Sequence, residues 1–209
     1  MVTELVAAFA GSGLEWEAIL VDDGSTDRTA AVLDAAARLN GRCRVLRLER
    51  TRGQGGALVA GFRAARAPVL GMMDGDGQNP PGELLNLYPL IGEADFINGI
   101  RVHRLDSSLR RWLSRRANAV RGRLLRDGLS DAGCALKVFK RPVADDFWPF
   151  PMLNPFMGAI ARASGYRVIE RPVAHRARAA GESKYGLRTT AWRPLIDLLA
   201  LWWLLRRRR

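Results

Sequence analysis

Apolar residues along this chain form short continuous runs separated by amphipathic stretches of helical length. A run of four to eight apolar residues predicts a buried strand, and apolar residues every three or four positions predict an amphipathic helix. Their alternation predicts an α/β fold with a mostly parallel sheet flanked by helices. The predicted strands are 17–21, 44–48, 69–73, 95–99, 134–139 and 167–173, and the predicted helices are 27–39, 55–66, 81–91, 107–126, 154–164 and one from 187.

Polar residues gather where these strands end. Asp22 and Asp23 follow the first predicted strand, Asp74 follows the third, and 99–101 end the fourth. Ligands of open α/β sheets bind outside the carboxyl ends of the strands. We therefore expect the functional site at this edge.

Length and composition fit one globular domain. The chain has 209 residues, of which 48% are hydrophobic, and its two cysteines are too few for a disulfide framework or a cysteine-rich zinc site. A reducing, cytosolic compartment is expected. We divide the chain into a main domain at 1–186 and a C-terminal helix with a basic tail at 187–209.

The net charge of +12 is concentrated in two places. Residues 99–128 hold nine arginines against two aspartates, and the chain ends in four arginines at 206–209. Positive charge gathered in this way indicates an anionic partner. Arginine also binds phosphate through two parallel hydrogen bonds where geometry allows.

Two acidic motifs suggest a bound ligand. Asp74 and Asp76 lie two residues apart in the sequence DGDGQNPP, so their carboxylates point the same way from an extended segment. With Gln78, this arrangement suits a hard divalent cation that also binds a diphosphate, and the alternative is a plain Asx turn at a strand end. Asp22 and Asp23 repel each other, which requires a hydrogen-bond donor or cation nearby.

Six motifs in this order resemble glycosyltransferase family 2, in particular the polyprenyl- and dolichyl-phosphate sugar transferases with the GT-A fold. The resemblance covers about 14–190. It rests on VDDGSTDRT, RGQGGA, MDGDGQNPP, NGIR, DAGCALKVFKR and GESKY.

The resemblance implies sites for a nucleotide-sugar donor. Asp22 and Asp23 would bind its base and ribose. Asp74, Asp76 and Gln78 would hold Mg²⁺ or Mn²⁺ on its diphosphate. His175, Arg178, Ser183 and Lys184 match a loop that closes over the donor.

The resemblance also implies a site for a polyprenyl phosphate acceptor. Arg101, Arg110 and Ser114 match positions that grip the acceptor phosphate, within the most basic stretch of the chain. Asp131 is a candidate for orienting the acceptor. An ionised phosphate needs positioning and charge neutralisation more than a strong base, so Asp76, Arg101 and Asp131 are the expected catalytic residues.

The chain departs from the family at its beginning. Relatives start with an apolar strand and a Pro-x-x-Asn-Glu segment, whereas here the first residues read as the helix that follows that strand. We expect a GT-A, Rossmann-like sheet that lacks its usual first strand. Either translation is assigned to start too late, which we favour, or the protein is a degenerate copy.

The end of the chain combines an apolar run at 198–205 with tryptophans and arginines. Eight residues cannot cross a bilayer, which requires about 20. The segment from 187 instead predicts an amphipathic helix with Trp192, Trp202 and Trp203 for a membrane surface, or a helix packed on the core.

We therefore expect an inverting, metal-dependent glycosyltransferase, peripheral on the cytoplasmic face of the cell membrane. Its partners would be a nucleotide-sugar, polyprenyl phosphate and the membrane surface, and not nucleic acid. One alternative is a basic nucleic-acid-binding protein, although a cleft lined by acidic residues would repel a polyanion. The other is an inactive glycosyltransferase-like scaffold.

Overall fold

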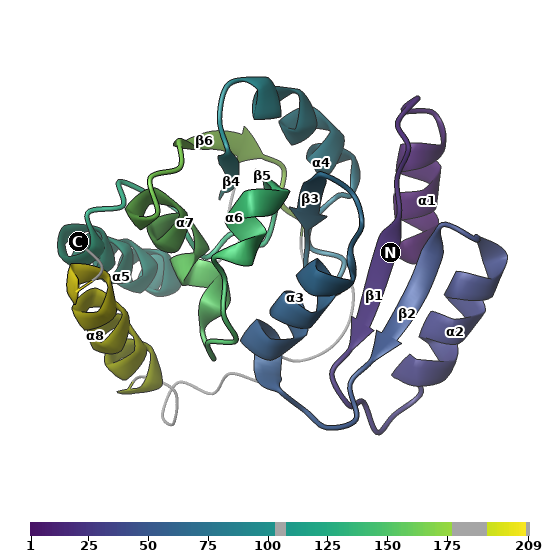
Figure 1. Cartoon of the computed structure of the whole chain (residues 1–209), viewed down its shortest axis with the longest axis horizontal. Coiled ribbons are helices and arrows are strands. Elements are labelled where there is room, and N and C mark those ends of the chain that lie inside the picture. Colours follow the sequence, from purple (N-terminus) through teal and green to yellow (C-terminus); the bar gives the residue numbers. More distant parts are fainter. Residues whose placement is uncertain (103–107, 177–191, 208–209) are drawn as a thin grey trace.

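The computed structural model describes residues 1–102, 108–176 and 192–207, without the side chains of 108–115 and 192–194 (Figure 1). Helices and strands alternate through its first two thirds. The elements are α1 (Val2–Ala10), β1 (Ala18–Asp22), α2 (Thr29–Leu39), β2 (Cys43–Arg47), α3 (Gly53–Ala64), β3 (Val69–Met72), α4 (Gly82–Leu87), η1 (Tyr88–Gly92), β4 (Phe96–Arg101), α5 (Ser108–Leu125), β5 (Lys137–Lys140), α6 (Arg141–Asp145), α7 (Leu153–Ala163), β6 (Val168–Val173) and α8 (Trp192–Arg207).

The strands form two sheets. β1 and β2 pair in parallel, and four strands form a second sheet in the order β3-β5-β4-β6. β4 and β6 are parallel, whereas β5 runs antiparallel to both β3 and β4. The predicted α/β fold with a mostly parallel sheet is confirmed, and β5 is the exception within the larger sheet.

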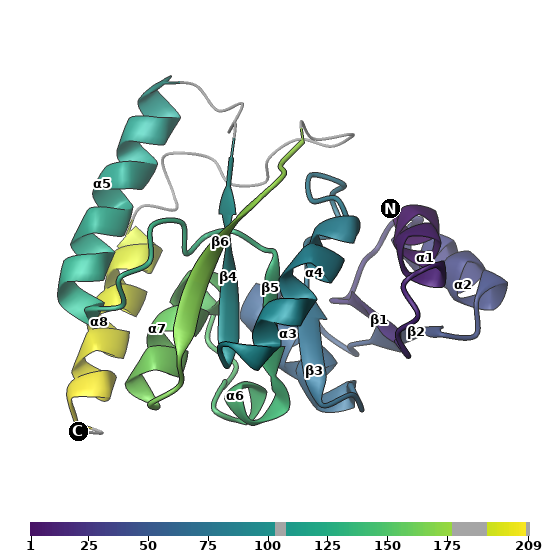
Figure 2. The same cartoon turned by 90° about the horizontal axis from the view of Figure 1, so that it is seen from above.

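β1 and β3 are not paired with each other, so the sheet is interrupted between them in the described part of the chain. This interruption agrees with the expectation that one strand is missing. Helices nevertheless connect the two sheets. α3 contacts β1 as well as α6 and α7, and α1 contacts α4 (Figures 1 and 2).

Alternating residues of β4 and β5 supply the two faces of the core. Phe96 and Phe139 are directly opposite each other and stack with ring centroids 5.5 Å apart. Phe147 meets both rings edge-on, and Phe62 meets Phe139 edge-on. Ile97 packs on the other face. This period of two is what a sheet covered by helices on both faces requires.

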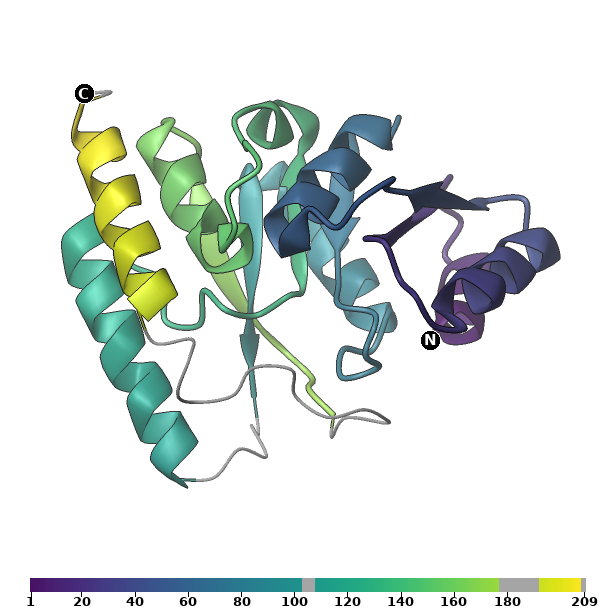
Figure 3. The ribbon, with the colours of Figure 1, turned by 90° about the horizontal axis from the view of Figure 1, so that it is seen from below.

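α8 also packs against the core, beside α5 (Figures 2 and 3). Leu198, Leu201 and Leu205 are buried, and Trp202 packs against the same cluster. The opposite face carries exposed apolar side chains, including Trp203. Of the described helices, none has both the length and the apolarity needed to cross a membrane.

Candidate functional site

Three predicted site residues lie at one edge of the larger sheet. Asp74 follows β3, and Arg101 ends β4. Asp131 precedes β5, whose antiparallel direction brings its beginning to the edge where β3 and β4 end. Asp22 ends β1 in the smaller sheet.

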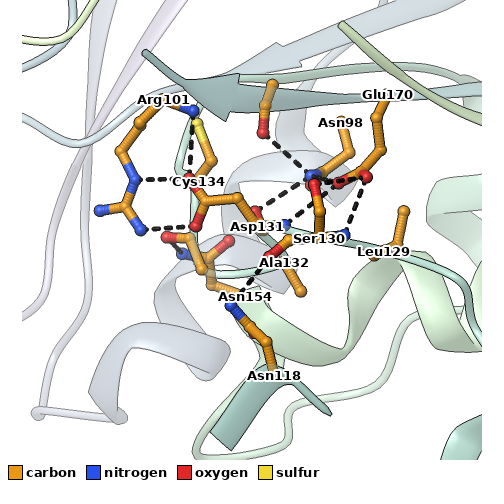
Figure 4. A network of polar contacts seen from close by, with 12 residues as sticks. Asn98, Arg101, Asn118, Leu129, Ser130, Asp131, Ala132, Cys134, Asn154 and Glu170 are labelled. Atoms are coloured by element: carbon orange, nitrogen blue, oxygen red, sulfur yellow. Dashed lines mark hydrogen bonds and ion pairs between the residues drawn. The ribbon is translucent and has the colours of Figure 1, made fainter. Parts of the chain in front are cut away.

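Arg101 and Asp131 form a two-pronged ion pair (Figure 4). The guanidinium of Arg101 donates from Nε to Oδ2 of Asp131 at 2.8 Å and from Nη2 to Oδ1 at 2.7 Å. The backbone N–H of Arg101 also donates to Oδ2, at 3.1 Å. Both side chains are mostly buried. The Asp131 carboxylate therefore fixes the direction of this guanidinium, because two parallel N–H groups of the planar guanidinium meet its two oxygens.

A network of polar contacts holds Asp131 in place. Asn98 donates from Nδ2 to the carbonyl of Asp131 at 3.1 Å and to Oε1 of Glu170 at 3.0 Å. Glu170 in turn accepts from the backbone N–H groups of Ser130 and Asp131 (Figure 4). The sequence analysis did not single out Glu170, and the available signal was a carboxylate in the middle of a predicted strand.

Lys137 supports the same turn from inside the protein. Its ammonium is fully buried and donates to the carbonyls of Ala132 (3.1 Å) and Cys134 and to Oδ1 of Asn154 (2.8 Å). Each of the three N–H groups of the ammonium thus has one oxygen acceptor. Burial lowers the pKa of Lys137 to about 8. The sequence analysis missed this role too, although a lysine within an apolar strand was a visible signal.

The segment after β3 forms a tight turn. Oδ1 of Asp76 accepts the backbone N–H of Gln78 at 3.1 Å, and Gly77 has a φ of 78°, which favours glycine. The carbonyl of Gln78 accepts the N–H of Arg176, which ties the turn to the segment after β6. The Asx turn weighed as an alternative is therefore present in this segment.

Asp74, Asp76 and Gln78 supply the oxygen donors that Mg²⁺ and Mn²⁺ prefer, and all three are only partly buried. Buried Asn79 leaves its Oδ1 without a hydrogen-bond partner beside them. Among the described residues, no group of three or more histidine, cysteine and acidic side chains could hold a metal by itself. The residues fit a divalent cation whose coordination is completed by oxygens of a ligand.

Asp22 and Asp23 are each provided with donors. Buried Asp22 accepts the N–H of Ser25 at 2.9 Å, and Arg47 lies 4.0 Å away. The hydrogen bonds from Ser25 hold the pKa of Asp22 below its usual value. Asp23 accepts the N–H of Arg52 at 2.7 Å. These contacts satisfy the expected need for donors beside two adjacent carboxylates.

Some arginines of the basic stretch pair with carboxylates of this chain. Arg101 pairs with Asp131, and Arg121 forms a buried pair with Asp127 while donating to the carbonyl of Leu129 at 2.8 Å. At least two arginines of this stretch therefore already bind a carboxylate of this chain.

Several predicted site residues cannot be placed at the level of side chains. Arg110 and Ser114 belong to α5, but their side chains lie outside the described residues, as do all of Arg178, Ser183 and Lys184. An open pocket of about 420 Å³ lies beside Ser130, and none of the predicted site residues lines it. Its walls are Asn118, Ala119, Gly122, Arg123, Leu129 and Ser130.

The chain is similar to known glycosyltransferases in sequence. The family model described as glycosyl transferase family 2 matches residues 1–148. Proteins named undecaprenyl-phosphate 4-deoxy-4-formamido-L-arabinose transferase match at 36% identity in Edwardsiella ictaluri, over 90% of this chain and 58% of the relative, and at 37% in Pseudomonas paraeruginosa, over 86% and 53%. The chain spans little more than half the length of these relatives.

Solved structures show the same fold. A glucosyl-3-phosphoglycerate synthase from Mycobacterium tuberculosis, in complex with Mn²⁺, uridine diphosphate and phosphoglyceric acid, aligns with a TM-score of 0.67 and 16% identity over 97% of this chain and 82% of that one. A mannosyl-3-phosphoglycerate synthase from Rubrobacter xylanophilus aligns with a TM-score of 0.65 and 14% identity, over 100% and 70%.

Proposed function

Because the chain belongs to glycosyltransferase family 2, we propose that it transfers a sugar from a nucleotide-sugar to a polyprenyl phosphate, with inversion at the sugar carbon. The observation that carries this proposal is the 36% identity to an undecaprenyl-phosphate sugar transferase over 90% of the chain. The strand-end residues supply the chemistry that such a transfer needs.

The donor is assigned to the acidic motifs. Asp22 and Asp23 would bind the base and ribose, and Asp74, Asp76 and Gln78 would hold Mg²⁺ or Mn²⁺ against the diphosphate. A bound divalent cation neutralises charge on the leaving diphosphate. Support for a metal comes from related folds in complex with Mn²⁺. Arg178 and Lys184 would close over the donor.

The acceptor is assigned to the basic side of the site. Arg101, Arg110 and Ser114 would hold the phosphate of the lipid, and Asp131 would keep Arg101 aimed at it. A planar guanidinium matches the geometry of a phosphate as well as that of a carboxylate. A phosphate oxygen held in this way is already a nucleophile at neutral pH, so orientation is the main contribution of the protein.

A membrane surface is the partner assigned to α8. The proposal places the protein at the cytoplasmic face of the cell membrane, where a polyprenyl phosphate presents its headgroup. Exposed apolar side chains on α8 and the arginines at its end support this placement.

A scaffold without catalytic activity is a second candidate. The interruption between β1 and β3 favours it, because the donor residues Asp22 and Asp74 lie on opposite sides of that break. The same experiment decides between the two candidates.

The test is sugar transfer to a short polyprenyl phosphate from labelled UDP- and GDP-sugars, with Mg²⁺ or Mn²⁺. Asp76→Ala is expected to reduce turnover by at least a hundredfold, and EDTA to abolish wild-type activity, while the fold is retained. Glu49→Ala removes an exposed carboxylate from another part of the surface and is the matched control. Absence of transfer from any donor would favour the scaffold, and full activity of Asp76→Ala in excess EDTA would contradict the metal site.

A further inference from the structure

Glu170 lies on β6 beside Asn98 of β4, directly opposite it in the parallel ladder. We propose that Glu170 is a positioning residue of the acceptor side: its carboxylate fixes the Ser130–Asp131 peptide, and through Asp131 it sets the direction of Arg101. This inference rests on the proposed function, in which Arg101 binds the acceptor phosphate.

The carboxylate of Glu170 is surrounded by donors. Oε2 accepts from the backbone N–H and from the hydroxyl of Ser130, each at 2.8 Å. Oε1 accepts from Nδ2 of Asn98 at 3.0 Å and from the backbone N–H of Asp131 at 3.3 Å. Two consecutive peptide N–H groups are thereby held by one side chain.

Asn98 closes the network from the neighbouring strand. Its fully buried amide donates to the carbonyl of Asp131 as well as to Glu170 (Figure 4). Both the N–H and the C=O of Asp131 are thus held by β4 and β6, which belong to the larger sheet. The side chain of Asp131 has little freedom to move away from Arg101.

The same peptide is connected to the basic helix. Nδ2 of Asn118 on α5 donates to the carbonyl of Ser130 at 2.9 Å. α5 also carries Arg110 and Ser114, the other residues assigned to the acceptor phosphate. The Ser130 peptide therefore connects the helix and the strand end that together would form the acceptor site.

A carboxylate is required at this position because all four of its partners donate. An amide could accept at its single oxygen, but its NH₂ group would face donor N–H and O–H groups. Glu170→Gln therefore keeps the size of the side chain and removes half of its accepting capacity. We expect the donors left without an acceptor to be accommodated by a shift of the Ser130–Asp131 peptide.

The test compares Glu170→Gln with Glu93→Gln in the full chain. Glu93 is an exposed carboxylate that lies 3.6 Å from Arg171, the residue after Glu170, and serves as the matched control. We expect Glu170→Gln to raise KM for polyprenyl phosphate about tenfold, with KM for the donor within twofold of wild type. A role in folding alone would move both constants, or neither.

A second readout does not depend on catalysis. In wild type, the Nε–H of Arg101 is hydrogen-bonded to Asp131 and should give a separate, slowly exchanging NMR signal, assigned by its loss in Arg101→Lys. We expect this signal to shift and exchange faster in Glu170→Gln and to stay unchanged in Glu93→Gln. If Glu170→Gln fails to fold, Ser130→Ala, which removes only the hydroxyl donor, should give the same shift to a smaller extent.

An unchanged Arg101 signal, or an acceptor KM equal to that of the control, would overturn the positioning role. If wild type transfers no sugar, the proposed function fails, and the Arg101 signal still decides whether Glu170 fixes that side chain. The two failures are thereby distinguishable.

Discussion

Individual charged side chains hold the turn before β5 in place at the edge of the larger sheet. Asp131 is neutralised by Arg101, and its peptide is held by Glu170, whereas the ammonium of Lys137 has only neutral oxygens as hydrogen-bond partners. A buried cation without a directly bonded anion is costly, which is why burial lowers the pKa of Lys137. Lys137 thus stabilises the turn through hydrogen bonds at a cost that depends on pH.

The pKa of Lys137 predicts a pH-dependent stability. In the folded protein this lysine loses its proton near pH 8, and in the unfolded chain near its ordinary value of about 10.4. Between these values the unfolded state binds more protons, so the contribution of Lys137 to the free energy of unfolding rises with pH. Urea unfolding from pH 7 to 10 should show wild type gaining roughly 1–3 kcal/mol relative to Lys137→Met. A constant difference across this range would contradict the lowered pKa.

At the scale of elements, the sequence located most helices and strands within a few residues. The predicted helix 81–91 is divided into α4 and η1, because Pro89 lacks an N–H and sits at the beginning of the 3₁₀ turn. β5 begins at Lys137, and not at 134, because the preceding residues form the turn that its ammonium holds. Periodicity could not reveal that β5 runs antiparallel, because strand direction depends on contacts distant in sequence.

Some residues of the candidate site could likewise be predicted from the sequence, and others could not. The roles proposed for Asp22, Asp74 and Arg101 could be suggested from the sequence because these residues lie at or just after strand ends, where ligands of α/β sheets bind. The pairing of Arg101 with Asp131 and the roles of Glu170 and Lys137 were not predictable, because each joins residues that only the fold brings together.

α8 has one face that packs against the core and another that is exposed and apolar. Leu198, Leu201 and Leu205 face the core, so deletion of the helix would disturb the fold. Four exposed apolar residues lie within about 100° of the helix circumference at 100° per residue, and we call them the α8 stripe. They are Leu195 (43% exposed), Ile196 (62%), Leu199 (48%) and Trp203 (51%).

We expect the α8 stripe to bind anionic vesicles. Changing Ile196, Leu199 and Trp203 together to Ser should weaken partition onto vesicles containing phosphatidylglycerol about a hundredfold, because each buried apolar side chain contributes on the order of 1 kcal/mol or more. Arg206 and Arg207, stacked on Trp202 and Trp203, add attraction to lipid phosphates. Sedimentation with vesicles measures the partition.

Val32→Ser with Leu39→Ser provides the control, because both side chains are exposed apolar groups on α2. This variant should bind vesicles as wild type does. Unchanged binding of the α8 variant would instead point to α5 as the membrane contact.

At the scale of the whole molecule, the two sheets differ in how many buried side chains pack against them. α1 and α2 contain no buried residue, and a two-stranded sheet is marginally stable by itself. The larger sheet carries the buried Phe96 and Phe139 and is covered by helices on both faces. The first 50 residues are therefore expected to open locally without unfolding of the rest.

Hydrogen exchange of the native protein should reveal this difference. Protection factors in β1 and β2 are expected to be about a hundredfold lower than in β4 and β5, since local opening breaks fewer buried contacts. The exchange of individual amides, followed by NMR, measures it. Equal protection in both sheets, responding equally to denaturant, would mean that they unfold as one unit.

The break between the sheets would give a bound donor, as proposed above, a mechanical role. Asp22 ends β1 on one side of the break, and Asp74 follows β3 on the other. A nucleotide-sugar held by both would act as a removable cross-link, and its binding energy would appear as added stability of the smaller sheet. The bound donor would then supply, between β1 and β3, the rigidity that backbone pairing provides within each sheet.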